Sequence, residues 1–375
     1  MTTILVDSNN ALTAALSNAH AGDTIALAAG TYSKVQIKNF NANGAITITS
    51  QDATHEAVLT GLEVGGSTGL NFNNLEFSFP MGDGSASPHG IMVRNSQDVH
   101  FLNDDIHGVL SADPTNQVTG IGIANSSNVS VQNSDLHDLH TGVTAGSDNN
   151  VTITGNYIHN IRVDGLEAMA DNTITVSGNT FTDFHHLGQS GVIDPTTGKQ
   201  GDHSDAIQFW TTGQTVGSNN VTISNNVISQ GNGRDMQGIF VQDAHGNLPY
   251  TNLQVTGNLI VGGNWNGIMV DDAKGGLIAD NIVQGLNTEN QSPWIKVQNS
   301  TGTTLSNNAA KTIGLGTNDT GLNVTGSKFA PVVSDGGSSE IASWLHSHSG
   351  SSIGLLGLHM GDLTASLGGP ILHTS

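Results

Sequence analysis

The chain contains no cysteine. A protein without cysteine has no disulfide and no thiolate-bound metal, so neither can stabilise its fold or form its active site. Positive charge is also scarce: 10 Lys and Arg stand against 31 Asp and Glu, which gives a formal net charge of −21 at pH 7. Because binding to nucleic acid or to an anionic membrane surface requires a dense basic surface, we expect neither as a partner.

Long apolar runs are missing as well. No stretch approaches the roughly 20 apolar residues that a membrane span requires. The first residues, MTTILVDSNN, lack the basic start and the apolar core of a signal peptide. These absences predict a chain without a membrane span and without an N-terminal signal peptide.

The chain is rich in glycine, with 48 residues, and in one repeated pattern. The segments NNVTITGNYI, NTITVSGNTF, NNVTISNNVI and TNLQVTGNLI alternate polar and aliphatic residues and then reach a Gly/Asn corner. Alternation with period two indicates strands, and irregular spacings around roughly two dozen residues indicate a solenoid with loops of varying length. Stacked side-chain amides can hydrogen-bond along such a solenoid. Six asparagines occupy one equivalent position of the repeat: Asn156, Asn179, Asn226, Asn258, Asn281 and Asn308.

The predicted fold is therefore all-β, a right-handed parallel β-helix. We place a catalytic β-helix domain at residues 1–315 and a less regular cover or tail at residues 316–375. The segment that starts at Asn10 reads as a short amphipathic helix followed by a first strand, and it would cap the open end of the solenoid. Residues 187–201 form a long polar loop, and SSEIASWLHSH resembles a second short helix.

A second repeat places side chains in columns on the outer surface. In segments such as TGIGIAN, DGLEAMA, DAIQFWT, QGIFVQD and NGIMVDD, the third and fifth residues are mostly aliphatic and should point inward. The first, fourth and sixth residues should then point outward, and coils about 4.8 Å apart align them in columns. These columns contain Asp164, Asp205, Gln237 and Asn266; Glu167, Gln208, Phe240, Met269 and Lys296; and Trp210, Gln242, Asp271 and Gln298.

Ionisable residues gather around the segment GDHSDAIQFW, at residues 201–210. Two residues before the first column lie Arg162, His203 and Asp235, which we expect to stack as well. Asp164 and Asp205 lie on adjacent coils, so repulsion between their two carboxylates would raise the pKa of one of them or require a cation between them. Because such groups are found more often at functional sites than on idle polar surfaces, we place the candidate site here.

Over residues 1–315, GDTIALAAGTY and the Asn-rich coils resemble the pectate-lyase-like β-helix superfamily. This superfamily includes polysaccharide lyases, polygalacturonase-type hydrolases, mannuronan C5-epimerases and tailspike glycosidases. The segment DHSDAIQFW is similar to the acidic calcium-binding strand of the lysine-dependent pectate lyases, and Asp202, Asp205 and Trp210 match that pattern. Gln208 stands where those enzymes have a further aspartate, and Phe240 where they have the catalytic lysine. The YGFDPHE motif of the epimerases is absent. The resemblance thus implies the fold, and the lysine mechanism does not carry over.

Two enzymatic mechanisms fit this cluster. In an endo-acting lyase, Arg162, Arg234 or a calcium ion neutralises a uronate carboxylate, and His203 removes the C5 proton for β-elimination. In a glycoside hydrolase acting on an acidic or bacterial surface polysaccharide, two carboxylates share the acid and base roles. For the hydrolase, Glu167 with Asp202 or Asp205 resembles the carboxylate trio of the tailspike glycosidases. A non-catalytic adhesin or scaffold is a third alternative, but it would spread its acids evenly over the surface.

We predict the lyase, acting on a uronate-containing exopolysaccharide. It is expected to be a monomer, secreted or displayed on the cell surface, and exported without an N-terminal signal peptide. The predicted catalytic residues are Arg162, Glu167, Asp202, His203, Asp205 and Arg234. The predicted substrate-binding residues are Gln208, Trp210, Asp235, Gln237, Gln242, Asp271 and Lys296. A calcium ion, if used, is expected on Asp164 and Asp205.

Overall fold

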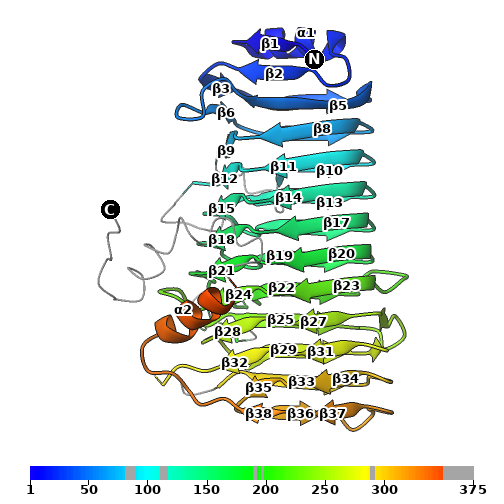
Figure 1. Ribbon diagram of the computed structural model, residues 1–375, viewed down its shortest axis with the longest axis vertical. Helices are drawn as coiled ribbons and strands as arrows, with labels where there is room; N and C mark the ends of the chain where they lie inside the picture. The colour runs from blue at the N-terminus through cyan, green and yellow to red at the C-terminus, as the bar shows by residue number, and fades with distance from the viewer. Residues whose placement is uncertain are drawn as a thin grey trace.

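The computed structural model of the chain is a solenoid in which every strand pairs in parallel with the strand one coil away (Figure 1). It describes residues 1–80, 89–109, 117–188, 200–287 and 292–348, together with residues 192, 193, 195 and 198. The strands form three sheets that run along the solenoid axis. Most coils contribute one strand to each sheet in turn, so residues far apart in sequence lie in direct register.

The first sheet has fifteen strands, of which β26 and β30 lie beside the main order. Its strands are β1 (Thr3–Val6), β2 (Thr24–Leu27), β5 (Asn41–Ser50), β8 (Thr68–Asn73), β11 (Gln97–Leu102), β14 (Ser127–Gln132), β17 (Asn149–Thr154), β20 (Asn172–Ser177), β23 (Asn219–Ser224), β26 (Tyr250–Thr251), β27 (Gln254–Thr256), β30 (Ala273–Lys274), β31 (Leu277–Ala279), β34 (Thr304–Ser306) and β37 (Asn323–Thr325).

The second sheet has eleven strands and carries the candidate site. Its strands are β4 (Val35–Lys38), β7 (Leu62–Gly65), β10 (His89–Arg94), β13 (Thr119–Ala124), β16 (Val143–Gly146), β19 (Leu166–Met169), β22 (Asp205–Trp210), β25 (Gln237–Gln242), β29 (Asn266–Asp271), β33 (Trp294–Gln298) and β36 (Ile313–Leu315).

The third sheet has twelve strands. They are β3 (Gly30–Tyr32), β6 (Ala57–Leu59), β9 (Glu76–Ser78), β12 (Asp105–His107), β15 (Asp135–His137), β18 (Tyr157–His159), β21 (Thr180–Thr182), β24 (Val227–Ser229), β28 (Leu259–Val261), β32 (Ile282–Gln284), β35 (Ala309–Ala310) and β38 (Lys328–Phe329).

Alternation along the strands builds the core. On β20, for example, Ile174 and Val176 are buried while Thr175 between them is partly exposed. Equivalent aliphatic residues of all three sheets join in one continuous hydrophobic cluster inside the solenoid. Because period-two alternation sends one face of each strand inward, the sequence pattern alone determines which residues enter this core.

The six predicted asparagines form a buried column at one corner of the solenoid, which confirms the expectation from their spacing. Asn156 donates both its backbone N–H and its side-chain Nδ2 to Oδ1 of Asn179, at 2.9 and 3.0 Å. The same two bonds join each later pair of this asparagine column. Each of these buried amides is therefore satisfied without water.

A second buried column, not predicted from the sequence, lies at the corner between the second and first sheets. The backbone N–H of each member donates to the side-chain oxygen of the next member along the axis. The members of this serine–aspartate column are Ser67, Ser96, Ser126, Asp148, Asp171 and Ser218. Serine and aspartate replace one another here because the position requires only a short side chain with an acceptor oxygen.

Both ends of the solenoid differ in detail from expectation. Helix α1 (Asn9–Asn18) covers the N-terminal end with Leu12 and Ala15, as predicted, but strand β1 precedes it. At the other end, β37 and β38 continue the coils beyond residue 315. The second predicted helix is present as α2 (Ser338–Ser347), and it packs Ile341 and Trp344 against the outside of β24 and β28 (Figure 1).

Of the predicted cover or tail at residues 316–375, the part at residues 349–375 lies outside the described residues. Within the part of the chain that the structure describes, no helix is long and apolar enough to span a bilayer.

Candidate active site

The second sheet aligns the predicted columns across β19, β22, β25, β29 and β33. The fourth-position column runs Glu167, Gln208, Phe240, Met269 and Lys296 in direct register. Trp210 pairs with Gln242, and Asp271 pairs with Gln298, as the sixth-position column predicts. The pattern therefore located each strand correctly relative to its neighbours in this sheet.

His203 and Asp205 form the central pair of the site. The imidazole Nδ1 lies 2.8 Å from Oδ2 of Asp205, which also accepts a 2.9 Å hydrogen bond from Nε2 of Gln208. The His203 side chain is 45% exposed, whereas the Asp205 side chain is fully buried. The hydrogen bond to Asp205 raises the pKa of His203 above its usual range. Burial raises the pKa of Asp205, and its bond to His203 opposes that rise.

The short turn before β22 sets this pair in place. Oγ of Ser204 donates to the backbone carbonyl of Val163, at 2.6 Å, and ties the turn to the preceding coil. The backbone N–H of Asp205 donates to Oδ1 of Asp164, at 2.9 Å. His203 is thereby fixed at the edge of the sheet, where its ring packs edge-on against Phe240.

Asp164 and Asp205 do not point into solvent, and this part of the prediction was wrong. They are 4% and 0% exposed. The Asp164 carboxylate lies along the solenoid axis because it accepts the amide of the next coil, and His203 and Gln208 contact the Asp205 carboxylate. Burial and the neighbouring Asp205 charge raise the pKa of Asp164 well above its usual range.

This arrangement does not fit the predicted calcium ion. Calcium takes six to eight oxygen ligands, but Oδ1 of Asp164 and Oδ2 of Asp205 already accept hydrogen bonds from N–H groups. The other oxygen of Asp205, Oδ1, has no hydrogen-bond partner among the described residues. No group of three or more His, Asp or Glu side chains suited to a metal is found within the described ranges.

Arg162 and Asp202 form a bidentate ion pair. Nε and Nη2 of Arg162 donate to Oδ2 and Oδ1 of Asp202, each at 2.9 Å. Asp202 also accepts the backbone N–H of Leu187, at 2.7 Å, so the pair holds the residue at which the predicted loop begins. Residues 189–191, 194, 196, 197 and 199 of that predicted loop lie outside the described residues. Burial and the Arg162 charge lower the pKa of the neighbouring His140 to about 4. Arg162 and Asp202 are thus engaged with each other beside the site.

Glu167 and Trp210 form a second pair, in which Glu167 lies opposite Gln208 on the adjacent strand. The indole Nε1 donates to Oε1 of Glu167, at 2.9 Å. Partial burial raises the pKa of Glu167, and the Trp210 bond opposes this effect. A carboxyl group with a raised pKa holds a proton more readily and can act as a general acid.

Several predicted residues lie outside this group. The expected stack of Arg162, His203 and Asp235 is not formed, since Asp235 lies 3.4 Å from His186. Arg234 is exposed, and Nη1 of its guanidinium donates to the backbone carbonyl of Gly188 at 3.5 Å. Asp271 accepts bonds from Gln298 and Asn299, at the opposite end of β29 from the His203 side of the sheet.

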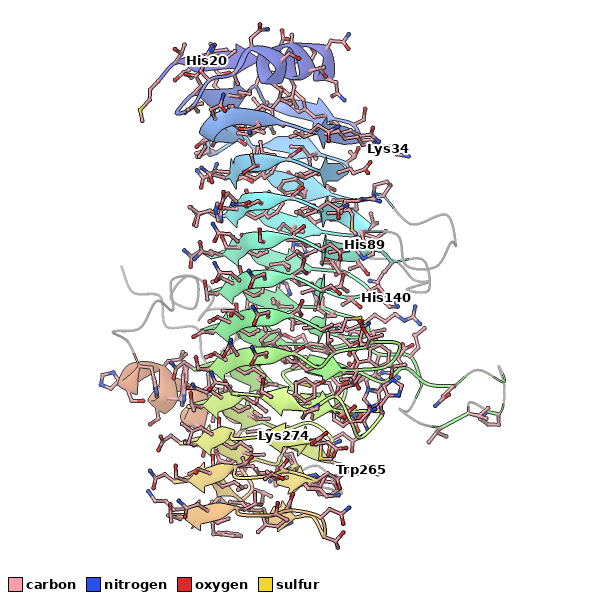
Figure 2. The ribbon with its side chains drawn as sticks, turned by 90° about the vertical axis from the view of Figure 1, so that its right-hand side faces the viewer. His20, Lys34, His89, His140, Trp265 and Lys274 are labelled. Carbon is pink, nitrogen blue, oxygen red and sulfur yellow. The ribbon has the colours of Figure 1, made fainter. Side chains whose placement is uncertain are left out.

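Two residues that the predicted site did not include, Asn266 and Trp294, are linked to it by hydrogen bonds. Nε2 of Gln237 lies 2.9 Å from Nε2 of His203, and Oε1 of Gln237 accepts from Asn266, which in turn accepts from the indole of Trp294 at 3.0 Å. A register shift in β29 brings Trp294 opposite Asn266. The exposed ring of Trp265 stacks on Trp294, and Figure 2 places Trp265 and His140 along the same side of the solenoid.

Comparison with a family model now identifies the fold. Residues 4–192 and 89–263 match the model described as a right-handed β-helix region. The chain belongs to this family. The predicted right-handed parallel β-helix is therefore confirmed, and the resemblance to the pectate-lyase-like superfamily holds at the level of the fold. No curated protein sequence matches the chain.

Solved structures with this β-helix have different activities. An alginate lyase from Paenibacillus sp. str. FPU-7 is 17% identical, over 88% of this chain and 99% of that one, with a TM-score of 0.50. The surface adhesin PfbA of Streptococcus pneumoniae is 13% identical, over 85% and 86% of the two chains, with a TM-score of 0.55. At these identities the likeness extends to the fold alone, so the function must be argued from the site.

Proposed function

We propose that this β-helix protein is a polysaccharide lyase that cleaves a uronate-containing polymer by β-elimination. The observation that carries the proposal is the pairing of a half-exposed imidazole, His203, with a fully buried carboxylate, Asp205, at 2.8 Å. A histidine held in this way can accept a proton near neutral pH, and the buried carboxylate orients the ring and stabilises its charged form. The likeness to an alginate lyase is consistent with this reaction on the same fold.

In the proposed reaction, His203 takes the proton from C5 of the uronate. The electron pair of the C5–H bond forms a C4=C5 double bond, and the bond between C4 and its glycosidic oxygen breaks. The leaving oxygen receives a proton from Glu167, whose raised pKa favours the acid form. Arg234, exposed and three residues before the start of β25 at Gln237, is the cation assigned to the uronate carboxylate, since Arg162 is engaged with Asp202.

A glycoside hydrolase is the second candidate, because Glu167 can serve equally well as the general acid of a hydrolase. That reaction needs a second carboxylate facing the sugar. Asp202 is bound to Arg162, and Asp205 is buried and bound to His203 and Gln208. The state of these two aspartates makes the lyase the better-supported candidate.

The two reactions leave different products, and this difference provides the test. The protein is incubated with alginate, polygalacturonate and other acidic polysaccharides while ultraviolet absorbance and reducing ends are followed together. The proposal expects both to rise in step, with neither rising for His203→Ala. Reducing ends without absorbance would identify a hydrolase. Binding without either product would identify a scaffold or adhesin.

The proposed substrate also bears on location. A polysaccharide of this kind lies outside the cell, so we propose that the protein acts as a secreted or cell-surface monomer. Size-exclusion chromatography with light scattering, and fractionation of the producing cells, test these two points directly.

A further inference from the structure

A chain of hydrogen bonds runs across four neighbouring coils and ends at His203. Nε1 of Trp294 donates to Oδ1 of Asn266 at 3.0 Å, and Nδ2 of Asn266 donates to Oε1 of Gln237. Nε2 of Gln237 lies 2.9 Å from Nε2 of His203. On the other side of the ring, Nδ1 of His203 lies 2.8 Å from Asp205. Each link joins residues on adjacent coils, apart from the last, which lies within one turn.

The chemistry of the first link fixes the direction of the others. An indole N–H can only donate, so Asn266 must present its oxygen to Trp294 and its amino group to Gln237. Gln237 then presents its oxygen to Asn266 and its amino group to His203. An amino group can only donate, so Nε2 of His203 must accept, and the ring proton must sit on Nδ1, facing the Asp205 carboxylate.

We propose that Trp294, Asn266 and Gln237 are positioning residues that hold His203 as the neutral Nδ1–H tautomer, with the lone pair on Nε2. The inference rests on the proposed function for the role of His203 as base, but the tautomer itself is a property of the free protein. Substrate would displace the amino group of Gln237 from Nε2 and put its own C–H in that place. The residue that fixes the state of the base thus lies three coils away from it, roughly 15 Å along the sheet.

The same chain opposes protonation of His203. A proton on Nε2 would face the amino group of Gln237. If the Gln237 amide turned, its amino group would face the amino group of Asn266. If the Asn266 amide turned as well, its amino group would face the indole N–H of Trp294. Among the charged groups, Asp205 contacts the ring directly and favours the charged form. Asp164 lies behind Asp205, and Asp202 is paired with Arg162. The remaining groups at the ring, Gln208, Gln237 and Phe240, are uncharged.

Nitrogen NMR of the histidine-labelled protein tests this inference without any substrate. The two ring nitrogens of His203, assigned by their loss in His203→Ala, are followed through a pH titration. The wild-type protein is expected to show a protonated Nδ1 and an unprotonated Nε2 above the pKa. In Asn266→Asp, the carboxylate cannot donate to Gln237, so the Gln237 amide is free to turn its oxygen towards His203. The pKa of His203 should then rise.

Asn264→Asp is the matched control, since it adds the same charge two residues away and outside the chain of bonds. The rise in Asn266→Asp should exceed the rise in the control by roughly one unit, which corresponds to one hydrogen bond. Trp294→Phe should shift the pKa in the same direction, because it removes the terminal donor. In all folded variants the acid limb of the pH profile of kcat/KM should move with the pKa.

Three results would overturn the inference. They are a wild-type ring with the proton on Nε2, equal pKa shifts in Asn266→Asp and Asn264→Asp, and an unchanged pKa in Trp294→Phe. If Asn266→Asp fails to fold, the wild-type tautomer and Trp294→Phe still decide the question. If no polysaccharide is cleaved at all, the proposed function fails while the NMR result stands on its own.

Discussion

Asp148 and Asp205 are both buried aspartates with raised pKa values, but different groups hold their oxygens. Oδ1 and Oδ2 of Asp148, in the serine–aspartate column, accept the backbone N–H groups of Ser126 and Gly146, at 2.6 and 2.8 Å. Oδ2 of Asp205 accepts from two side chains, His203 and Gln208, and its Oδ1 has no partner among the described residues. The Asp148 carboxylate is thus closed off by backbone, while the Asp205 carboxylate is connected to a titrating ring.

This difference limits what burial can say about function. Burial raises the pKa of Asp148 to about 6 and that of Asp171 to about 8, although both lie in the serine–aspartate column at a corner of the solenoid. A perturbed carboxylate in this fold therefore indicates a site only when a side chain that can exchange protons is its partner. By this criterion Asp205 belongs to the site and Asp148 does not, and Asp164, whose Oδ1 accepts a backbone amide, resembles Asp148.

The largest expected effect is on catalysis. His203→Ala removes the proposed base, so we expect kcat to fall by about 10²–10⁴-fold. Asp205→Asn should also inactivate the enzyme, because the buried charge that stabilises the imidazolium is lost. Its thermal midpoint should change little, since the asparagine oxygen can still accept from His203 and Gln208. Turnover at the wild-type rate in both variants, measured by absorbance, would move the site elsewhere.

The next effect is the pH dependence of stability through Asp171. Its pKa is raised in the folded state from 3.8 to about 8, mainly by burial. Between these values the unfolded chain releases this proton and the folded chain keeps it, so the free energy of unfolding falls as pH rises. The slope from one such group reaches at most about 1.4 kcal/mol per pH unit. Calorimetry of wild type and Asp171→Asn from pH 4 to 8 should show a flatter profile for the variant, and parallel profiles would contradict this assignment.

Asp148→Asn should lower stability and leave activity unchanged, the reverse of the result expected for Asp205→Asn. An asparagine has one oxygen, so its amino group would face one of the two backbone N–H donors that Asp148 now accepts. Leaving a buried donor without a partner costs about 1–3 kcal/mol. We expect a lower thermal midpoint at pH 7 with unchanged kcat/KM in the surviving folded enzyme. A loss of activity without a loss of stability would erase the distinction between the two kinds of carboxylate.

The smallest expected effect is that of removing divalent cations. Oδ1 of Asp164 accepts the backbone N–H of Asp205, and Oδ2 of Asp205 accepts from Nε2 of Gln208, so neither oxygen is directed at a cation site. We therefore expect a chelator to leave activity and thermal midpoint nearly unchanged, with magnesium-saturated chelator as the control. A loss of both that calcium restores would require these side chains to rearrange around the ion.

The sequence predicted the fold because the repeat is local and redundant. Alternation determined the inward faces, and the single residue type at Asn156 and its equivalents marked one corner in six successive coils. The serine–aspartate column escaped notice because Ser126, Asp148 and Ser218 share an acceptor oxygen but not a residue type. Column positions in the second sheet were correct, as the register of Glu167 with Gln208 shows.

Within the site, the sequence predicted proximity better than side-chain partners. It grouped His203, Asp205 and Gln237, but it treated the first position as outward, and the buried Asp205 contradicts that. It expected Arg162 to face substrate, while the structure pairs it with Asp202. Trp294 was missed for a specific reason. Even spacing would put Pro293 opposite Asn266, and the register shift in β29 puts Trp294 there instead.

The asparagine column has a consequence for the electrostatic polarity of the whole solenoid. Every side-chain amide in it points the same way, with its amino group towards the next coil and its oxygen towards the previous one. Aligned amides add their dipoles, as they do along a helix. The negative end faces the backbone N–H of Ser134 and, one coil further, the buried Asp104, whose pKa is raised well above its usual range by burial. The bonds from Trp294 to Gln237 run in the opposite sense, so the partial positive charge at their end falls on His203.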